Sequence, residues 1–103
     1  MKITMYGAAI CPDCVVAKQQ LSTKQDVELE YKDITSTTAT LKEFLKFRDF
    51  EPMFEQVKND GKIGIPFFVL EDGTKTFDIE TYVAFDPNLE RPVNACSIDG
   101  KNC

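Results

Sequence analysis

The sequence predicts one α/β domain, in which helices flank a four-stranded mixed sheet. A chain of 103 residues, 43% of them hydrophobic, is long enough for one core and too short for two. Strand-like and helix-like segments follow one another as strand, helix, strand, helical region and two strands, an order typical of a parallel crossover followed by an antiparallel hairpin. We place the domain at residues 1–85 and regard 86–103, rich in Pro, Asn, Asp and Gly, as a C-terminal tail of uncertain order.

The first half of the chain reads as strand, helix and strand. Residues 2–6 are rich in β-forming side chains and precede a turn signal at Gly7, so they predict the first strand. Pro12 suits the first position of a helix that we extend to Ser22. Residues 27–34 alternate apolar and charged side chains with a period of two, which is typical of a half-solvated strand.

The middle of the chain predicts two helical pieces and most of the core. Threonines within 35–40 offer helix caps, and apolar residues recur at helical spacing over 41–45 and again over 50–57. Pro52 does not fit inside one continuous helix, so we place a break at 49–51. We expect six phenylalanines to form much of the core: Phe44, Phe47, Phe50, Phe54, Phe67 and Phe68.

The last part of the domain predicts a hairpin and a short helix. Residues 65–70 form a nearly continuous apolar run, as in a strand buried on both faces. The segment 71–74 reads as a tight turn into a strand at 75–77. Asp78 is a candidate cap for a terminal helix that we extend to Phe85.

Charge and composition exclude several classes of function. Seventeen acidic residues against twelve basic give a formal net charge of −5, which argues against a nucleic-acid partner bound through its phosphates. We see no apolar run long enough for a membrane span or a secretory signal, and we therefore expect a cytoplasmic protein. We also expect a monomer. The absence of histidine removes imidazole from the candidate acids, bases and metal ligands.

Four cysteines remain as the candidates for chemistry, and they separate into two pairs. In a reducing compartment, cysteines more often serve catalytic, redox or metal-binding roles than structural disulfides. Cys11 and Cys14 have redox spacing, whereas Cys96 and Cys103 lie six residues apart in the tail. That wider spacing is unlike a second zinc knuckle, so we predict no metal site. The tail cysteines form either an accessory disulfide or redox-inert thiols, and we favour inert thiols.

The pair Cys11–Cys14 suits thiol–disulfide exchange. A cysteine at a helix N-terminus is stabilised as a thiolate by unpaired backbone N–H groups and by the helix dipole, which predicts Cys11 as the nucleophile. Cys14, about one turn inward, is placed to attack a mixed disulfide on Cys11 and release the reduced substrate. Pro12 stiffens the loop between them.

Ile65 and Pro66 predict a second component of the site. Proline lacks the N–H that a sheet ladder uses, so a proline that opens a buried strand marks a place where no partner strand is needed. We expect a cis Ile65–Pro66 bond, with the backbone of Ile65 presented beside the cysteines so that an extended substrate pairs with it.

Taken together, these residues resemble a glutaredoxin, within the thioredoxin-fold superfamily. The resemblance spans residues 1–85 and is carried by the strand ending at Tyr6, Cys11-Pro12-Asp13-Cys14, Ala17-Lys18, Leu21-Ser22 and Ile65-Pro66. It implies a thioredoxin-like, glutaredoxin-type fold, Cys11 as the attacking cysteine, Cys14 as the resolving one and Pro66 as the cis-proline. It also implies disulfide substrates, glutathione as a candidate co-substrate and no tightly bound cofactor. The candidate substrate-binding residues are Tyr6, Pro12, Lys18, Ile65, Pro66 and Asp78.

The sequence departs from the glutaredoxin pattern where glutathione would bind. Ala8 stands where the family usually has lysine, Asp13 stands where it commonly has tyrosine, and Thr76-Phe77-Asp78 replaces a glycine pair before an acidic cap. Asp78 is still placed to face an α-amino group, and Lys18 shares a helical face with Cys14. Glutathione is an anion, so the loss of a lysine and the gain of an aspartate make the electrostatics of the site less favourable for it. The reductant is therefore either glutathione or a partner like thioredoxin reductase.

Two other functions fit the same residues. Some glutaredoxins carry an iron–sulfur cluster, and Cys11 would be the ligand in such a metal carrier. Alternatively, the domain is a non-catalytic thioredoxin-fold binding module that grips a partner near Pro66, with Cys11 and Cys14 as a redox sensor.

Overall fold

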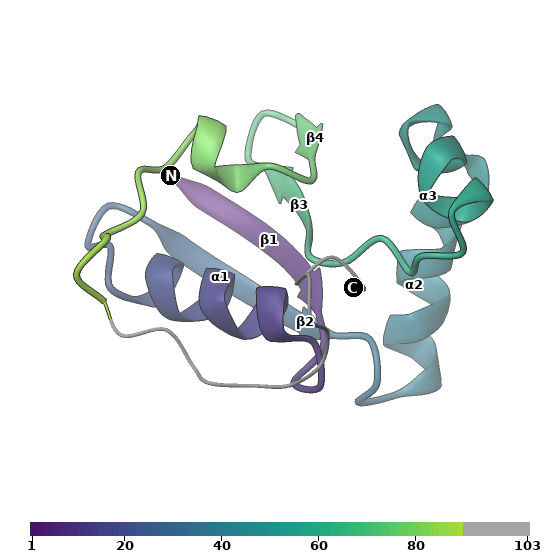
Figure 1. The fold of residues 1–103 in the computed structure, drawn as a ribbon, viewed down its shortest axis with the longest axis horizontal. Coiled ribbons are helices and arrows are strands. Elements are labelled where there is room, and N and C mark those ends of the chain that lie inside the picture. The colour runs from purple at the N-terminus through teal and green to yellow at the C-terminus, as the bar shows by residue number, and fades with distance from the viewer. Residues whose placement is uncertain (90–103) are drawn as a thin grey trace.

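The computed structural model describes residues 1–89 and confirms the predicted α/β fold class (Figure 1). The elements are β1 (Lys2–Gly7), α1 (Pro12–Ser22), β2 (Glu28–Asp33), α2 (Thr38–Phe50), the 3-10 turn η1 (Pro52–Phe54), α3 (Glu55–Asn59), β3 (Phe67–Leu70), β4 (Lys75–Thr76) and the 3-10 turn η2 (Ile79–Thr81). Their arrangement resembles a thioredoxin-like fold, with a β1–α1–β2 crossover at the start.

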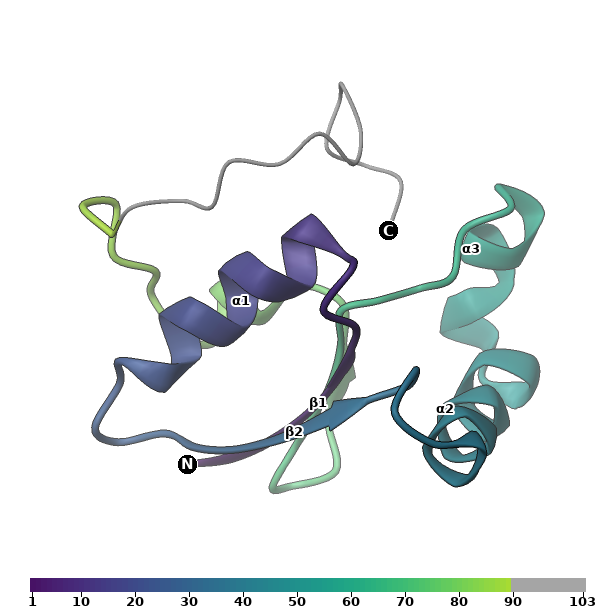
Figure 2. The same ribbon diagram turned by 90° about the horizontal axis from the view of Figure 1, so that it is seen from below.

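The four strands form one mixed sheet in the order β2-β1-β3-β4. β1 runs parallel to β2, with Met5 opposite Tyr31, and antiparallel to β3, with Tyr6 opposite Phe67. β4 closes the hairpin with β3 as predicted. Figure 2 shows α1 on one side of this sheet and α2 on the other, so each face of the sheet has its own helical cover.

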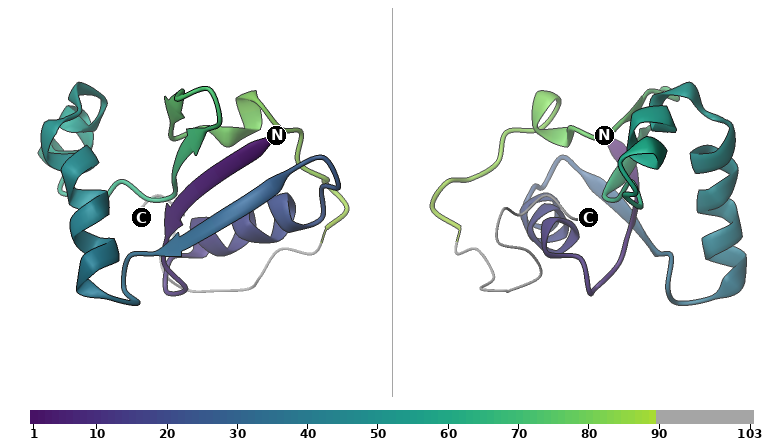
Figure 3. Two further views of the ribbon diagram at one scale, coloured as in Figure 1. Left: turned by 180° about the vertical axis from the view of Figure 1, so that it is seen from behind. Right: turned by 45° about the vertical axis from the view of Figure 1, so that its right-hand side comes forward.

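Helix α1 packs along β1 and β2 on one face of the sheet, as the view from behind in Figure 3 shows. Pro12 occupies its first turn, as predicted, and its buried side chains include Ala17 and Leu21. Gln20 is also buried, and its side-chain amide bonds the backbone N–H and C=O of Asp86 at 2.7 and 2.9 Å. These two bonds fix the chain that follows η2 against α1.

An aromatic cluster fills the α2 face. Tyr6, Phe44 and Phe67 meet there with ring centroids 6.0–6.3 Å apart. Phe54 stands edge-on to Phe67 at 4.8 Å, a geometry that aromatic quadrupoles favour. Five of the six phenylalanines predicted to form the core are buried or packed against it.

Phe50 is the exception, since 81% of its surface is exposed and its predicted place in the core was wrong. The helical spacing of Phe50 with the apolar residues that follow it runs through Pro52, but α2 ends at Phe50, and Glu51 turns to an extended conformation with φ −84° and ψ 127°. The break therefore lies where it was predicted, and it changes the direction of the chain, so Phe50 does not share a face with the apolar residues that follow. Leu41, at the other end of α2, is also 38% exposed.

The segment around the hairpin differs from prediction in extent. The peptide bond Ile65–Pro66 is cis, as predicted, and β3 begins after it, at Phe67 rather than at Ile65. The helix predicted from Asp78 to Phe85 is a single 3-10 turn. The Gln20 side chain hydrogen-bonds the backbone of Asp86 and holds it against α1, so the chain does not continue as a helix. Within residues 1–89, no helix has the length and apolar character needed to cross a bilayer.

Candidate functional site

Cys11 is the N-cap of α1. Its backbone is extended, with φ −100° and ψ 116°, and its Sγ accepts a hydrogen bond from the backbone N–H of Cys14 at 3.3 Å. An N-cap acceptor of this kind satisfies one of the four backbone donors that a helix start leaves unpaired. The sulfur of Cys11 therefore lies where backbone N–H groups and the helix dipole favour negative charge. Its side chain is buried, with 3% of its surface exposed.

Cys14 is completely buried, one turn inside α1, against the end of β1. A Cβ atom placed on Gly7 would lie 3.0 Å from Cys14 Sγ and 3.3 Å from the Tyr31 ring carbon Cε1. Glycine at position 7 thus makes room for the second sulfur beside the sheet. The sequence indicated Gly7 only as a turn residue, and spacing along the chain did not predict that it also makes room for Cys14.

Tyr31 is a neighbour of the cysteines that sequence reasoning missed. Burial, followed by the charge of Asp33 and smaller contributions from Cys14 and Cys11, raises the pKa of Tyr31 to about 12. The Lys18 ammonium lies 4.4 Å from the centre of its ring, a cation–π contact. The period-two phase of β2, which sets Tyr31 opposite Met5 of β1, was the signal available for this placement.

A pocket of about 220 Å³ lies between α1, β3 and the segment after β4, and we call it the α1–β3 pocket. Pro66 lines it together with Asp13 of the Cys-Pro-Asp-Cys motif and Asp78. The structure therefore brings the proline and two of the acidic candidates to one site. The remaining lining residues are Val16, Ala17, Phe68, Phe77, Ile79, Glu80 and Phe85.

The polar lining of this pocket is acidic. Asp13, Asp78 and Glu80 are all exposed to solvent. Asp78 Oδ2 accepts a hydrogen bond from the Thr81 hydroxyl at 3.1 Å, rather than capping a backbone N–H of η2. Glu80 was not a candidate in the sequence, because the predicted terminal helix gave no reason to place it near α1.

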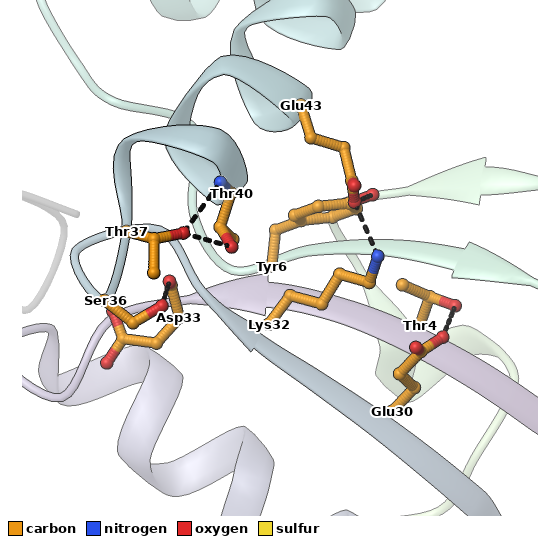
Figure 4. A network of polar contacts seen from close by, with 9 residues as sticks. All are labelled: Thr4, Tyr6, Glu30, Lys32, Asp33, Ser36, Thr37, Thr40 and Glu43. Atoms are coloured by element: carbon orange, nitrogen blue, oxygen red, sulfur yellow. Dashed lines mark hydrogen bonds and ion pairs between the residues drawn. The ribbon is translucent and has the colours of Figure 1, made fainter.

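Tyr6, a predicted site residue, lies away from the pocket, and Arg48 of α2 supports a loop. Tyr6 is on the α2 face, where its hydroxyl donates to Glu43 and Lys32 donates to the same carboxylate at 2.7 Å (Figure 4). Burial, and then the bond to Glu43, raises the pKa of Tyr6. Arg48 bonds the carbonyls of Lys62 and Ile63, at 2.8 and 3.0 Å, and so supports the loop that leads to Ile65.

The remaining candidates are placed as follows. Ala8, which stands where glutaredoxins usually have lysine, is buried. Ile65 is buried directly before Pro66. Among residues 1–89, no three Cys, Asp or Glu side chains gather as metal ligands. Cys96 and Cys103, predicted to be redox-inert, lie outside the described residues.

Comparisons with known proteins find a distant relative. No protein-family model matches the chain, and no solved structure matches it. An uncharacterized protein of Haemophilus influenzae is 28% identical over 78 residues, which cover 76% of this chain and 90% of that protein. Since that relative has no named function, the functional argument rests on the Cys11–Cys14 pair at the start of α1.

Proposed function

We propose that the protein is a thiol–disulfide oxidoreductase of glutaredoxin-like type that uses both cysteines of its motif. The observation that carries the proposal is the position of Cys11 Sγ, which caps α1 and accepts the N–H of Cys14 at 3.3 Å. A sulfur in this position is stabilised as a thiolate, which is the nucleophilic form of cysteine. Cys14 follows one turn later, close enough in the chain to form a disulfide with Cys11.

The reaction transfers two electrons from the protein to its substrate. The Cys11 thiolate attacks one sulfur of a substrate disulfide, forming a mixed disulfide and releasing the other sulfur as a thiolate that takes up a proton. Cys14 then loses its proton and attacks Cys11 Sγ, and the second substrate sulfur leaves and is protonated. The substrate is reduced to two thiols, and the protein is oxidised to a Cys11–Cys14 disulfide.

The backbone at Ile65 is the proposed docking point for an extended substrate. β3 pairs with β1 only from Phe67 onward, so Ile65 lies outside the sheet ladder. A substrate segment that pairs with Ile65 would add a short strand beside Pro66. Because Cys11 is 3% exposed, the side chains around its sulfur must give way as the substrate docks.

Substitution of each cysteine tests the mechanism. With dithiothreitol as electron donor, we expect Cys11→Ser to abolish the protein's acceleration of insulin disulfide reduction and to leave only the uncatalysed rate. In a separate experiment without dithiothreitol, we expect pre-reduced Cys14→Ser to release one substrate thiol per protein and to retain a mixed disulfide on Cys11, visible by mass spectrometry. The double variant Cys96→Ser/Cys103→Ser removes thiols outside the motif and is expected to keep full turnover.

Two outcomes would contradict the proposal. Turnover that survives Cys11→Ser would exclude Cys11 as the nucleophile. Loss of turnover in Cys96→Ser/Cys103→Ser, with Cys11 and Cys14 intact, would move the resolving step to the tail. The physiological electron donor is a separate question, which is answered by mixing the oxidised protein with glutathione, or with thioredoxin reductase and NADPH, and counting protein thiols.

A further inference from the structure

We propose that the α1–β3 pocket selects polypeptide disulfides flanked by lysine or arginine and disfavours anionic disulfides such as that of glutathione. The inference rests on the proposed function, since the pocket acts here as the specificity region of the Cys11–Cys14 site. It goes further by naming the charge of the substrate. The acidic residues take no part in the chemistry itself. They select which disulfide substrates reach the cysteines.

The three carboxylates of the pocket come from two separate parts of the chain and line the same pocket. Asp13 belongs to α1 and lies between Pro12 and Cys14, whereas Asp78 and Glu80 follow β4. No lysine or arginine within residues 1–89 lines this pocket. The ion pairs in that part of the chain join Lys32, Arg48 and Lys75 to acids outside the pocket, so its three negative charges are not neutralised by such pairs.

The apolar part of the pocket suits the same class of substrate. Val16 and Ala17 of α1 line the pocket together with Phe68, Phe77 and Phe85, around a volume of about 220 Å³. A lysine or arginine side chain has an aliphatic stem that gains from apolar contact and a charged head that stays in water. The pocket offers apolar surface for such a stem and carboxylates at the rim for the head. Pro66, on the same pocket, connects it to the proposed docking strand.

At neutral pH glutathione carries two carboxylates and one ammonium. Its net charge is therefore negative, opposite to that of a lysine or arginine side chain. Coulomb's law in water gives about a twofold effect for each pair of unit charges about 8 Å apart. Three carboxylates acting on one net charge therefore produce roughly a tenfold preference at low salt, which shrinks to a few-fold at 0.15 M as the charges are screened. The family's usual lysine, absent here, would have reduced this preference.

The test measures single-turnover rate constants of the reduced protein with four disulfides at low and high ionic strength. Three are peptides of equal length whose disulfide is flanked by two lysines, two serines or two glutamates, and the fourth is glutathione disulfide. We expect the lysine peptide to react about tenfold or more faster than the glutamate peptide at low salt, with glutathione disulfide slower than the serine peptide, and the differences to shrink as salt rises.

Two triple variants with the same change in net charge isolate the pocket. Asp13→Asn/Asp78→Asn/Glu80→Gln is expected to bring the lysine-to-glutamate rate ratio to about two or below. Glu28→Gln/Glu55→Gln/Glu71→Gln neutralises three exposed carboxylates elsewhere and is expected to preserve the ratio. Comparing ratios within each variant removes any change in the reactivity of Cys11 itself.

The outcomes separate this inference from the proposed function. Equal rates for the three peptides, or a ratio that falls equally in both triple variants, would overturn the pocket's role and leave the oxidoreductase proposal standing. Faster reaction with glutathione disulfide than with the lysine peptide would also overturn it. Failure of the neutral reagent hydroxyethyl disulfide to oxidise Cys11 and Cys14 would overturn the proposed function, and this inference with it.

Discussion

The two faces of the sheet are built differently, although one set of strands forms both. Around the cysteines, the α1 face consists of small residues. Gly7, Cys14 and Ala17 allow the start of α1 to lie close to the end of β1. The α2 face is packed with large rings, among which Phe67 contacts Tyr6, Phe44, Phe47, Phe54 and Phe77. Figures 2 and 3 show how the sheet separates the two helices.

This difference indicates that the two faces have different roles: the α2 face stabilises the domain, and the α1 face carries the candidate site. A small domain has little apolar surface to bury, so the aromatic cluster supplies a large share of its stability. The α1 face is then free to carry two sulfurs and exposed carboxylates, groups that contribute little to hydrophobic burial. Variants on each face show whether the two functions are separable.

The largest expected effect on stability is that of Phe54→Ala on the α2 face. Phe54 is fully buried, with its ring centroid 4.8 Å from those of Phe67 and Phe77. Removing it should lower the free energy of unfolding by about 3–5 kcal/mol, measured by urea denaturation. Disulfide exchange per folded molecule should change less than twofold, since the ring lies across the sheet from Cys14.

Phe50→Ala is the matched control, because Phe50 is 81% exposed. The same substitution there should change the free energy of unfolding by less than about 0.5 kcal/mol. If Phe54→Ala slowed exchange in proportion to its loss of stability, the two faces would not be separable.

Gly7→Ala is expected to have a smaller effect on stability and a specific one on chemistry. Its new Cβ would lie 3.0 Å from Cys14 Sγ, so the second sulfur or the strand must shift. We expect a loss of about 1–3 kcal/mol in the free energy of unfolding and slower release of the second substrate thiol, followed by stopped-flow thiol detection.

Gly61→Ala provides the comparison for that variant. Gly61 has a φ of +72° and no atom within 4 Å of a Cβ placed on it, so alanine there costs backbone strain far from the sulfurs. The strain is about 1 kcal/mol. Equal rates of thiol release in Gly7→Ala and Gly61→Ala would show that position 7 has no special relation to Cys14.

The smallest expected effect concerns the polar network on the α2 face in Figure 4. Hydrogen bonds from Lys32 and then Tyr6 hold the pKa of Glu43 below its ordinary value. A lowered folded-state pKa means that the stabilisation is present above the unfolded value, near 4.5, and is lost as pH falls through the folded one. Because both side chains of the ion pair are partly exposed, its contribution is about 0.5–1 kcal/mol.

Urea denaturation of the wild type and Glu43→Gln from pH 7 to pH 3 measures that contribution. The advantage of the wild type should be present at pH 7 and should disappear by pH 3. Glu55→Gln, an exposed carboxylate on α3, should show no such pH-dependent difference. An advantage that persists unchanged at pH 3 would mean that Glu43 acts through packing rather than charge.

Local patterns were sufficient for the strands, α1, the break before Pro52 and the cis bond at Pro66, because each depends on a few neighbouring residues. Patterns failed in two places. Phe50 is exposed because the helical spacing of apolar residues does not continue across the break at Glu51. The terminal helix is a single turn because Gln20, far away in the chain, holds Asp86, and no short-range rule contains that contact.

The sequence by itself determined the fold class and the place of Cys11 at the start of a helix, since periodicity and the Cys-Pro-Asp-Cys spacing are local properties. Only the tertiary structure placed Tyr31 beside Cys14 and gathered Asp13, Asp78 and Glu80 around one pocket. Tyr31 is far from Cys14 in the chain, and Asp13 is far from Asp78 and Glu80. They meet because strand register and helix packing fix which side chains share a face.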